Sequence, residues 1–150
     1  MSAGRIQSIN DGVFIMGIKI LAKAKDGGPK SPVDAYFLIE WKSVFSIAIL
    51  KFHKGMREQY HTHAFNALTW FISGHLVEDN FGGLPYVYGR GIIPKVTKRE
   101  KCHRVMATKD SWCLTIRGPW VKYWSEVDAE TKTKNTFTNG RVLTTTEKIL

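Results

Sequence analysis

Histidines are the residues of this chain whose type and spacing could do chemistry. Five are present, and two of them form the pattern His61-Thr62-His63; the others are His53, His75 and His103. Because side chains of a β-strand alternate between its two faces, His61 and His63 are expected to project from the same face. Two adjacent imidazoles are half of a site for zinc, iron, nickel or copper. A His-x-His pair also occurs for structural reasons, so its surroundings must decide between the two roles.

The elements that would position these histidines are expected to be β-strands. Segments 35–41 and 43–52 are rich in aromatic and β-branched residues, and segment 61–74 predicts a strand pair or one long bent strand. Glycine and proline clusters separate further short strand candidates. Short strands at this spacing, with few helical patterns, predict an all-β sandwich or barrel.

The two ends of the chain differ from this central part. Segment 13–22 could form a strand or a short helix, and the glycine- and proline-rich segment 25–32 separates it from the main body. After Trp124 the chain is polar and threonine-rich, so it either holds a hairpin around Asn139-Gly140 or is partly mobile. We expect one domain over residues 1–150, with a core at about 36–124 and a tail at 125–150.

Composition and charge narrow the class of protein. With 43% hydrophobic and 23% charged residues, whole-chain disorder is not expected. Two cysteines are fewer than a secreted disulfide scaffold of this size usually carries. No signal peptide and no membrane-spanning run is visible, which favours a cytoplasmic protein without a membrane partner. The net charge of +9 favours an anionic partner, which could be nucleic acid, a nucleotide, a phosphate or a carboxylate.

The run from Gly55 to Gly74 resembles the first motif of the cupin superfamily. That motif has a glycine, five residues, His-x-His, three or four residues, a glutamate, six residues and a second glycine. Both glycines and both histidines match at Gly55, His61, His63 and Gly74, whereas Ala67 stands at the glutamate position. The resemblance implies an all-β, double-stranded β-helix barrel of the cupin type, with a short N-terminal element and a polar C-terminal tail.

The segment from Pro94 to His103 resembles the second cupin motif, which supplies one more histidine ligand. The usual glycine and asparagine of that motif are not present here. Together the two motifs imply a metal site made of His61, His63 and His103. This three-histidine set resembles that of thiol dioxygenases within the superfamily.

A closer resemblance is to small cupin-like proteins of bacteria and tailed phages, and it covers about residues 36–124. The segments that carry it are Leu50–His53, His61–Phe65, Gly74 with Glu78, His103-Arg104 and Trp112–Pro119. It implies the fold and the histidine set, and little about the reaction.

An inner wall for a substrate is expected beyond the histidine pair. Strand alternation after His63 places Phe65, Ala67, Thr69 and Phe71 on the inner face, which gives an apolar wall with one hydroxyl group. Plain core packing is the alternative role for the two phenylalanines.

Three further residues could bind a substrate. Arg117 is expected on the strand face of Cys113 and Thr115, where it could bind an anion; the alternative is a surface arginine at a strand end. Arg57 and Tyr60 precede the histidine pair at the expected rim of the barrel, and either could touch a ligand.

Function is expected to depend on one divalent transition metal, iron in the first place, with zinc, nickel or copper as alternatives. Three neutral imidazoles leave the ion its full charge and leave coordination positions open. One hypothesis is therefore a metal-dependent oxygenase or hydroxylase, for example a dioxygenase, that acts on a small polar or anionic substrate. The other is a non-catalytic cupin that binds or sequesters a small anionic ligand such as a nucleotide, as would suit a phage context.

The expected partner is a small molecule rather than nucleic acid. The dense aromatic residues from Trp112 to Trp124 could stack on bases, but core closure is the favoured role, and no nucleic-acid motif is present. Cys102 is expected to face away from His103, and a disulfide with Cys113 is not expected. Because cupins commonly pair through their outer strands, a homodimer is also expected.

Overall fold

The computed structural model describes residues 13–56, 59–138 and 141–149, and this part of the chain contains strands and no helix. The strands are β1 (Val13–Ile15), β2 (Ile18–Lys25), β3 (Val33–Trp41), β4 (Phe45–Phe52), β5 (Gly55–Met56), β6 (Tyr60–His61), β7 (Ala67–Asn80), β8 (Tyr86–Val87), β9 (Lys95–Thr97), β10 (His103–Arg117), β11 (Trp124–Asp128), β12 (Thr133–Thr138) and β13 (Val142–Lys148). The predicted all-β class is therefore confirmed. It follows that no described helix could cross a membrane.

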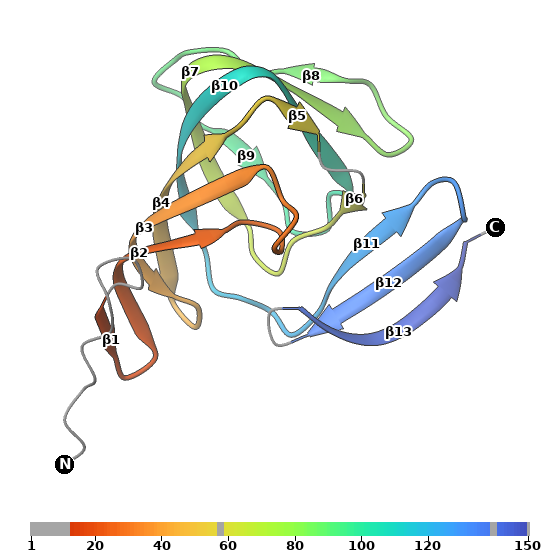
Figure 1. The fold of residues 1–150 in the computed structure, drawn as a ribbon, viewed down its shortest axis with the longest axis horizontal. Helices are drawn as coiled ribbons and strands as arrows, with labels where there is room; N and C mark the ends of the chain where they lie inside the picture. The colour runs from red at the N-terminus through yellow and green to blue at the C-terminus, as the bar shows by residue number, and fades with distance from the viewer. Residues whose placement is uncertain (1–12, 57–58, 139–140, 150) are drawn as a thin grey trace.

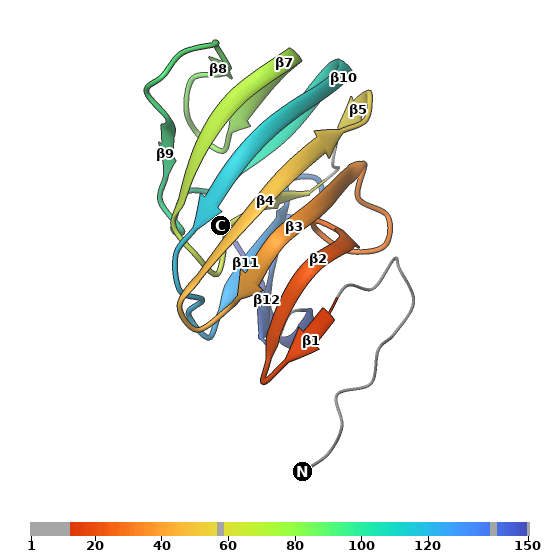
Figure 2. The same ribbon diagram turned by 90° about the vertical axis from the view of Figure 1, so that its left-hand side faces the viewer.

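One wall of the barrel is a curved antiparallel layer. Strands β1, β2, β3, β4, β10 and β7 lie side by side in this order, and β8 and β9 pair with β7 (Figure 2). The inner face of this wall carries the main hydrophobic core, which includes Ala35, Phe37, Leu50, Leu76 and Cys113. Segment 13–22, which could have been a strand or a helix, belongs to the β1–β2 hairpin.

Strand β10 joins the two walls of the barrel. Its first residues pair with β5 and β6, its last residues pair with β4, and β7 follows almost its whole other edge. The β7–β10 register shifts near Gly74, whose φ is +103°. A Cβ atom at Gly74 would lie 2.1 Å from Ser111 Oγ, so only glycine fits this bend.

The second wall is formed by β6, β11, β12 and β13, which lie on the other side of the barrel interior (Figure 1). The expected tail at 125–150 thus contributes paired strands, and Val127 and Phe137 are buried. Buried residues also precede position 36, so the core extends beyond 36–124 at both ends. Residues Asn139-Gly140 lie outside the described part, but the strands on either side of them pair as a hairpin requires.

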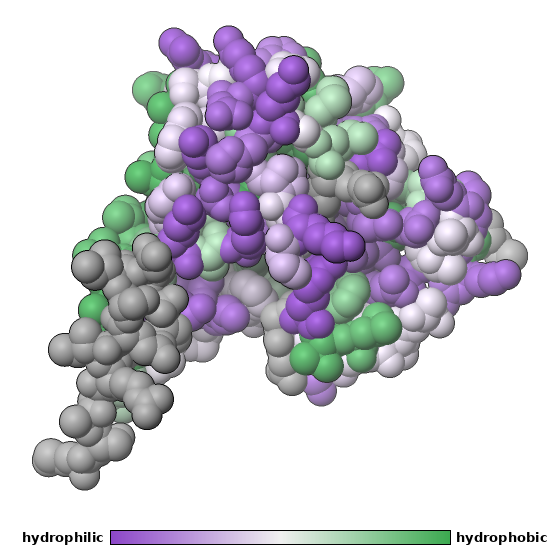
Figure 3. Space-filling view, in the orientation of Figure 1, coloured by the Kyte–Doolittle hydropathy of each residue, from purple (hydrophilic) through white to green (hydrophobic). Residues whose placement is uncertain are grey.

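The outer surface is mostly hydrophilic on the face shown in Figure 3, with hydrophobic side chains gathered along the edge near β1 to β4. Exposed apolar residues there include Leu21, Leu38 and Val44. A homodimer through outer strands stays a prediction.

Candidate metal centre

The three histidines predicted as ligands meet inside the barrel. His61 ends β6, His103 begins β10, and the two are direct partners across the sheet. His63 follows β6, and its ring centroid lies 4.8 Å from that of His61 and 4.9 Å from that of His103; the His61 and His103 centroids are 5.0 Å apart. One ring nitrogen of each histidine lies within 4.8 Å of the other two. Among the described residues this is the one group of three or more His, Cys, Asp or Glu with such a spacing.

The sequence suggested that a regular strand carries the His-x-His pair. The structure shows that the backbone there is not a regular strand. Strand β6 ends at His61, which pairs with Glu126 on β11 as well as with His103. Beyond it, the Thr62 N–H donates to the Ser125 carbonyl (2.8 Å) and the His63 N–H donates to the Arg99 carbonyl (2.9 Å). Both rings still enter the same cavity, because segments from two other parts of the chain hold this short loop.

The chemistry of the histidines fits a divalent transition metal. His61 and His103 are buried, at 8% and 3% exposure, and neither ring nitrogen of His103 makes a well-aligned hydrogen bond. On one side of that ring, Nδ1 faces Glu78 Oε2 at 3.1 Å. A carboxylate in this position stabilises the proton on Nδ1 and leaves the Nε2 lone pair available to a metal.

Glu78 is the centre of a buried ionic cluster behind His103. It is fully buried on β7, and Oε2 accepts hydrogen bonds from Lys95 (2.6 Å) and from the Tyr88 hydroxyl (3.0 Å), while Oε1 pairs with Lys101. Burial raises the pKa of Glu78, but its close contacts with His103, Lys101 and Lys95 outweigh burial and hold this pKa well below its usual value. Glu78 is therefore an anion at neutral pH. We call Glu78, Tyr88, Lys95 and Lys101 the Glu78 cluster.

In the sequence, Glu78 stands out only as part of a family resemblance, and its contact with His103 was not predicted. A signal was available, because strand alternation places Glu78 on the same face as the apolar Leu76 two positions earlier. In the structure both residues are fully buried on β7. An acidic side chain at an inward position needs buried partners. The lysines that supply them come from β9 and from the segment after it, which no local pattern connects to β7.

A cavity of about 420 Å³ extends from the histidines through the barrel, a size within the usual range for small-molecule sites. Its lining includes the predicted wall residues Phe65, Ala67 and Thr69, and the Thr69 hydroxyl donates to Thr115 Oγ1 at 3.3 Å. Phe71 instead packs against the hydrophobic core. Further lining residues that the sequence did not suggest are Asp26, Tyr88, Trp120, Trp124 and Arg141.

Arg117, predicted as an anion-binding residue or a surface arginine, is buried in the cavity wall at 4% exposure. Its Nη2 donates to Asp26 Oδ2 at 2.6 Å. Its guanidinium carbon lies 4.6 Å from the ring centroid of Phe65 and 5.6 Å from that of Phe37. The structure thus places Arg117 in the cavity and excludes the surface alternative.

The other two predicted substrate residues lie elsewhere. The Tyr60 hydroxyl donates to Asp79 at 2.7 Å, the Arg104 guanidinium lies over its ring, and Tyr60 is not part of the cavity lining. This follows from strand alternation, which turns Tyr60 away from the side of His61. Arg57 falls outside the described residues.

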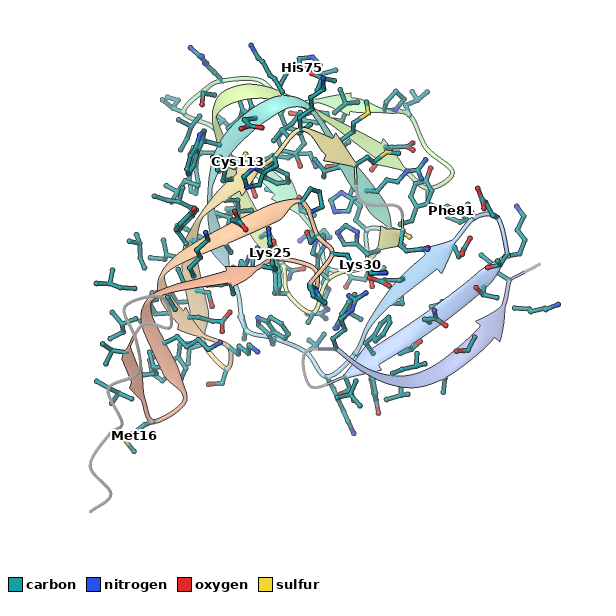
Figure 4. The ribbon with its side chains drawn as sticks, viewed as in Figure 1. Met16, Lys25, Lys30, His75, Phe81 and Cys113 are labelled. Carbon is teal, nitrogen blue, oxygen red and sulfur yellow. The ribbon has the colours of Figure 1, made fainter. Side chains whose placement is uncertain are left out.

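The remaining histidines and cysteines are not part of the three-histidine group. His53 lies 2.8 Å from Asp34, and His75 lies 2.7 Å from Thr108 on the outside of the barrel (Figure 4). Cys102 and Cys113 are both free thiols. Cys113 lies in the cavity wall, and burial raises the pKa of its thiol to about 12, so it is not a ready nucleophile.

Comparison with known proteins supports the fold. No protein-family profile and no curated protein matches the chain. A sugar phosphate isomerase of the cupin superfamily from Silicibacter pomeroyi matches with a TM-score of 0.54 and 12% identity over 75% of this chain and 76% of that one. A protein with a double-stranded β-helix domain from Klebsiella pneumoniae matches with a TM-score of 0.53 and 14% identity over 69% and 84% of the two chains. An ectoine synthase from P. lautus matches with a TM-score of 0.51 and 13% identity over 66% and 72%. These likenesses show the cupin-type fold, and identities this low show the fold alone.

Proposed function

We propose that this cupin-type barrel is a metal-dependent enzyme, an oxygenase or hydroxylase, that acts on a small polar or anionic substrate. The observation that carries the proposal is the convergence of His61, His63 and His103 at the wall of a cavity of small-molecule size. A divalent ion held by three neutral imidazoles, iron in the first place, would keep its full charge and open coordination positions, and would supply Lewis-acid or oxygen chemistry.

The chain's own residues have separate tasks in this proposal. Glu78 fixes the orientation and the tautomer of His103, since its carboxylate faces Nδ1 of that ring. Phe65 and Trp120, whose ring centroids are 5.5 Å apart, form an apolar wall that limits the access of water. Arg117 supplies a positive charge for an anionic substrate. The reaction class rests on the ligand set, because one fold hosts many activities.

Elemental analysis is the first test. We expect about one transition metal per chain in the wild-type protein, and in His75→Ala as the matched control. In His63→Ala and in His103→Ala we expect less than about a tenth of that amount, with an unchanged circular dichroism spectrum. The same low metal content in wild-type protein after anaerobic reconstitution with ferrous iron would refute the proposal.

A second test addresses oxygen chemistry. Nitric oxide resembles dioxygen as a ligand, so ferrous protein with open positions should give the electron paramagnetic resonance signal of a high-spin iron–nitrosyl species. Protein that holds iron at the three histidines but gives no such signal would refute the oxygenase assignment and leave the metal site intact.

Non-catalytic capture of a small anionic ligand, such as a nucleotide, is the second candidate. Ala67, which stands where the resembling motif has a glutamate, and the cationic residues of the cavity lining favour it. Metal-dependent turnover of the captured ligand would exclude this candidate.

A further inference from the structure

Arg117 is a buried cation whose hydrogen-bonding capacity is not used up. Its Nη2 donates to Asp26, but its Nε is buried without a hydrogen-bond partner. Buried polar groups in proteins nearly always have partners, so an exception of this kind calls for an explanation, and a ligand is one. A planar carboxylate on the Nε–Nη2 edge would accept two parallel hydrogen bonds, whereas Asp26 accepts one.

The surroundings of Arg117 connect it to the metal ligands. The ring of Phe65 lies against the Arg117 guanidinium and also 5.4 Å from the ring of His63, so one aromatic ring separates the cation from the histidines. On another side of Phe65 lies Trp120, whose Nε1 is also buried without a hydrogen-bond partner. The wall beside the metal site therefore holds two unused donors and an apolar surface between them.

The charges of the cavity lining also favour an anion. Three cationic side chains line the cavity, those of Lys25, Arg117 and Arg141, and Asp26 is the one carboxylate among the lining residues. Lys25 lies at the end of β2 (Figure 4), and residues 26–29 of the turn after it also line the cavity. Asp26 begins that turn and its side chain is 32% exposed, whereas Arg117 lies on a strand with neighbours on both edges.

We propose that Arg117 is the anion-binding subsite of the cavity and that Asp26 occupies it until a ligand displaces it. The ligand is a small molecule with an oxyanion, a carboxylate or a phosphate, at one end and an apolar body that lies along Phe65 and Trp120. Its other end then reaches the three histidines. That this ligand is a substrate rests on the proposed function, but oxyanion binding itself requires no metal.

Calorimetric titration of metal-free protein with benzoate, phenyl phosphate and the neutral control benzamide tests the subsite. We expect one of the two anions to bind at one site per chain, at least about tenfold more tightly than benzamide, since hydrogen bonds to charged groups are the strong ones. The better anion identifies the oxyanion as carboxylate or phosphate. Equal affinity for the anions and for benzamide would overturn the proposal.

Variants assign the binding to Arg117. Arg117→Gln should lower the affinity for the better-binding anion by about tenfold or more. Arg117→Lys keeps the charge but not the forked geometry of the guanidinium, so its affinity should lie between those of Arg117→Gln and the wild type. Arg104→Gln is the matched control, because Arg104 lies on the same strand but pairs with Asp79 away from the cavity. Unchanged anion affinity in Arg117→Gln, with a wild-type circular dichroism spectrum, would overturn the proposal.

Asp26→Asn tests the displacement. If Asp26 competes with the ligand for Arg117, the neutral side chain of the Asp26→Asn variant should tighten anion binding by about threefold to tenfold. The reason is that Arg117 is then free in a larger fraction of molecules. Weaker or unchanged binding would refute the competing role. Metal uptake is measured on separate aliquots of the same preparations after reconstitution with ferrous iron. Protein that takes up metal but binds no anion refutes this inference alone, and protein that binds the anion but no metal refutes the proposed function alone.

Discussion

The Glu78 carboxylate and the Arg117 guanidinium are both buried charges in one barrel, but their surroundings differ. Glu78 has Lys95, Lys101, Tyr88 and the imidazole of His103 around its two oxygens. Arg117 has one carboxylate, from a partly exposed side chain, and two aromatic faces. Each oxygen of the Glu78 carboxylate lies within ion-pair distance of a lysine, whereas the Arg117 guanidinium has one carboxylate partner and its Nε is buried without an acceptor.

This difference separates a group that holds a position from a group that receives a ligand. Neighbours that saturate a buried charge fix its geometry and, through it, the ring of His103. An unsatisfied buried donor lowers the stability of the ligand-free protein, and such a loss is tolerated where function requires it. The two charges should therefore respond differently to mutation.

The largest effect is expected when the Glu78 carboxylate is removed. Glu78→Ala leaves Lys95 buried without its counter-charge and should lower the free energy of unfolding by about 3–5 kcal/mol, the usual cost of breaking a buried ion pair. Urea denaturation of the metal-free protein measures it. Asp79→Ala is the matched control, because Asp79 is the next residue, is 40% exposed in its ion pair with Arg104, and should cost about 1 kcal/mol or less. Equal costs for the two variants would show that the cluster does not stabilise the fold.

A smaller effect is expected on metal binding when Glu78 keeps its shape but loses its charge. Glu78→Gln should weaken metal affinity by about 10–100-fold, because the partner that holds the Nδ1 proton of His103 is then neutral. Competition with a chromophoric chelator measures this change. Tyr88→Phe removes one hydrogen bond to the same carboxylate without touching His103, and should change metal affinity less. A Gln variant with wild-type affinity would mean that Glu78 does not position the ligand.

The sequence predicts features that depend on local patterns better than features that depend on contacts between residues far apart in the chain. The strand class and the His61–His63 pair were predicted from local patterns, strand alternation and His-x-His spacing, whereas His103 was implied only by the resemblance to the second cupin motif. The sequence left Arg117 open between the cavity and the surface, because its partner Asp26 lies 91 positions earlier in the chain. For the tail, the sequence left a hairpin and partial mobility open, since all seven residues of β13 are exposed and leave no alternation to detect.

A still smaller effect on stability is expected at Arg117. Arg117→Met keeps an apolar stem beside Phe65 and removes the unsatisfied donor, while Asp26 can turn to water. We therefore expect the free energy of unfolding to change by no more than about 1 kcal/mol, because the Asp26 carboxylate left behind is 32% exposed and no buried charge remains without compensation. The same urea titration measures it. A loss as large as that of Glu78→Ala would place Arg117 with the structural charges and remove the contrast.

The smallest effect on the free energy of unfolding is expected at Asp34. This residue tests whether an ion pair stabilises the fold when the partners of the carboxylate are not buried. Its carboxylate lies 2.8 Å from both Lys25 Nζ and His53 Nε2, and these hydrogen bonds, from Lys25 first and then His53, lower its pKa from 3.8 to about 2. Since the pKa is lower in the folded state, the stabilisation is complete above the unfolded value of about 3.9 and is lost as the pH falls towards 2. The difference in unfolding free energy between wild type and Asp34→Asn should therefore shrink from pH 5 to pH 2. A difference that does not change with pH would mean that the ion pair of Asp34 does not form in solution. It would also mean that the partners of a carboxylate must be buried, as they are around Glu78, before an ion pair stabilises this barrel.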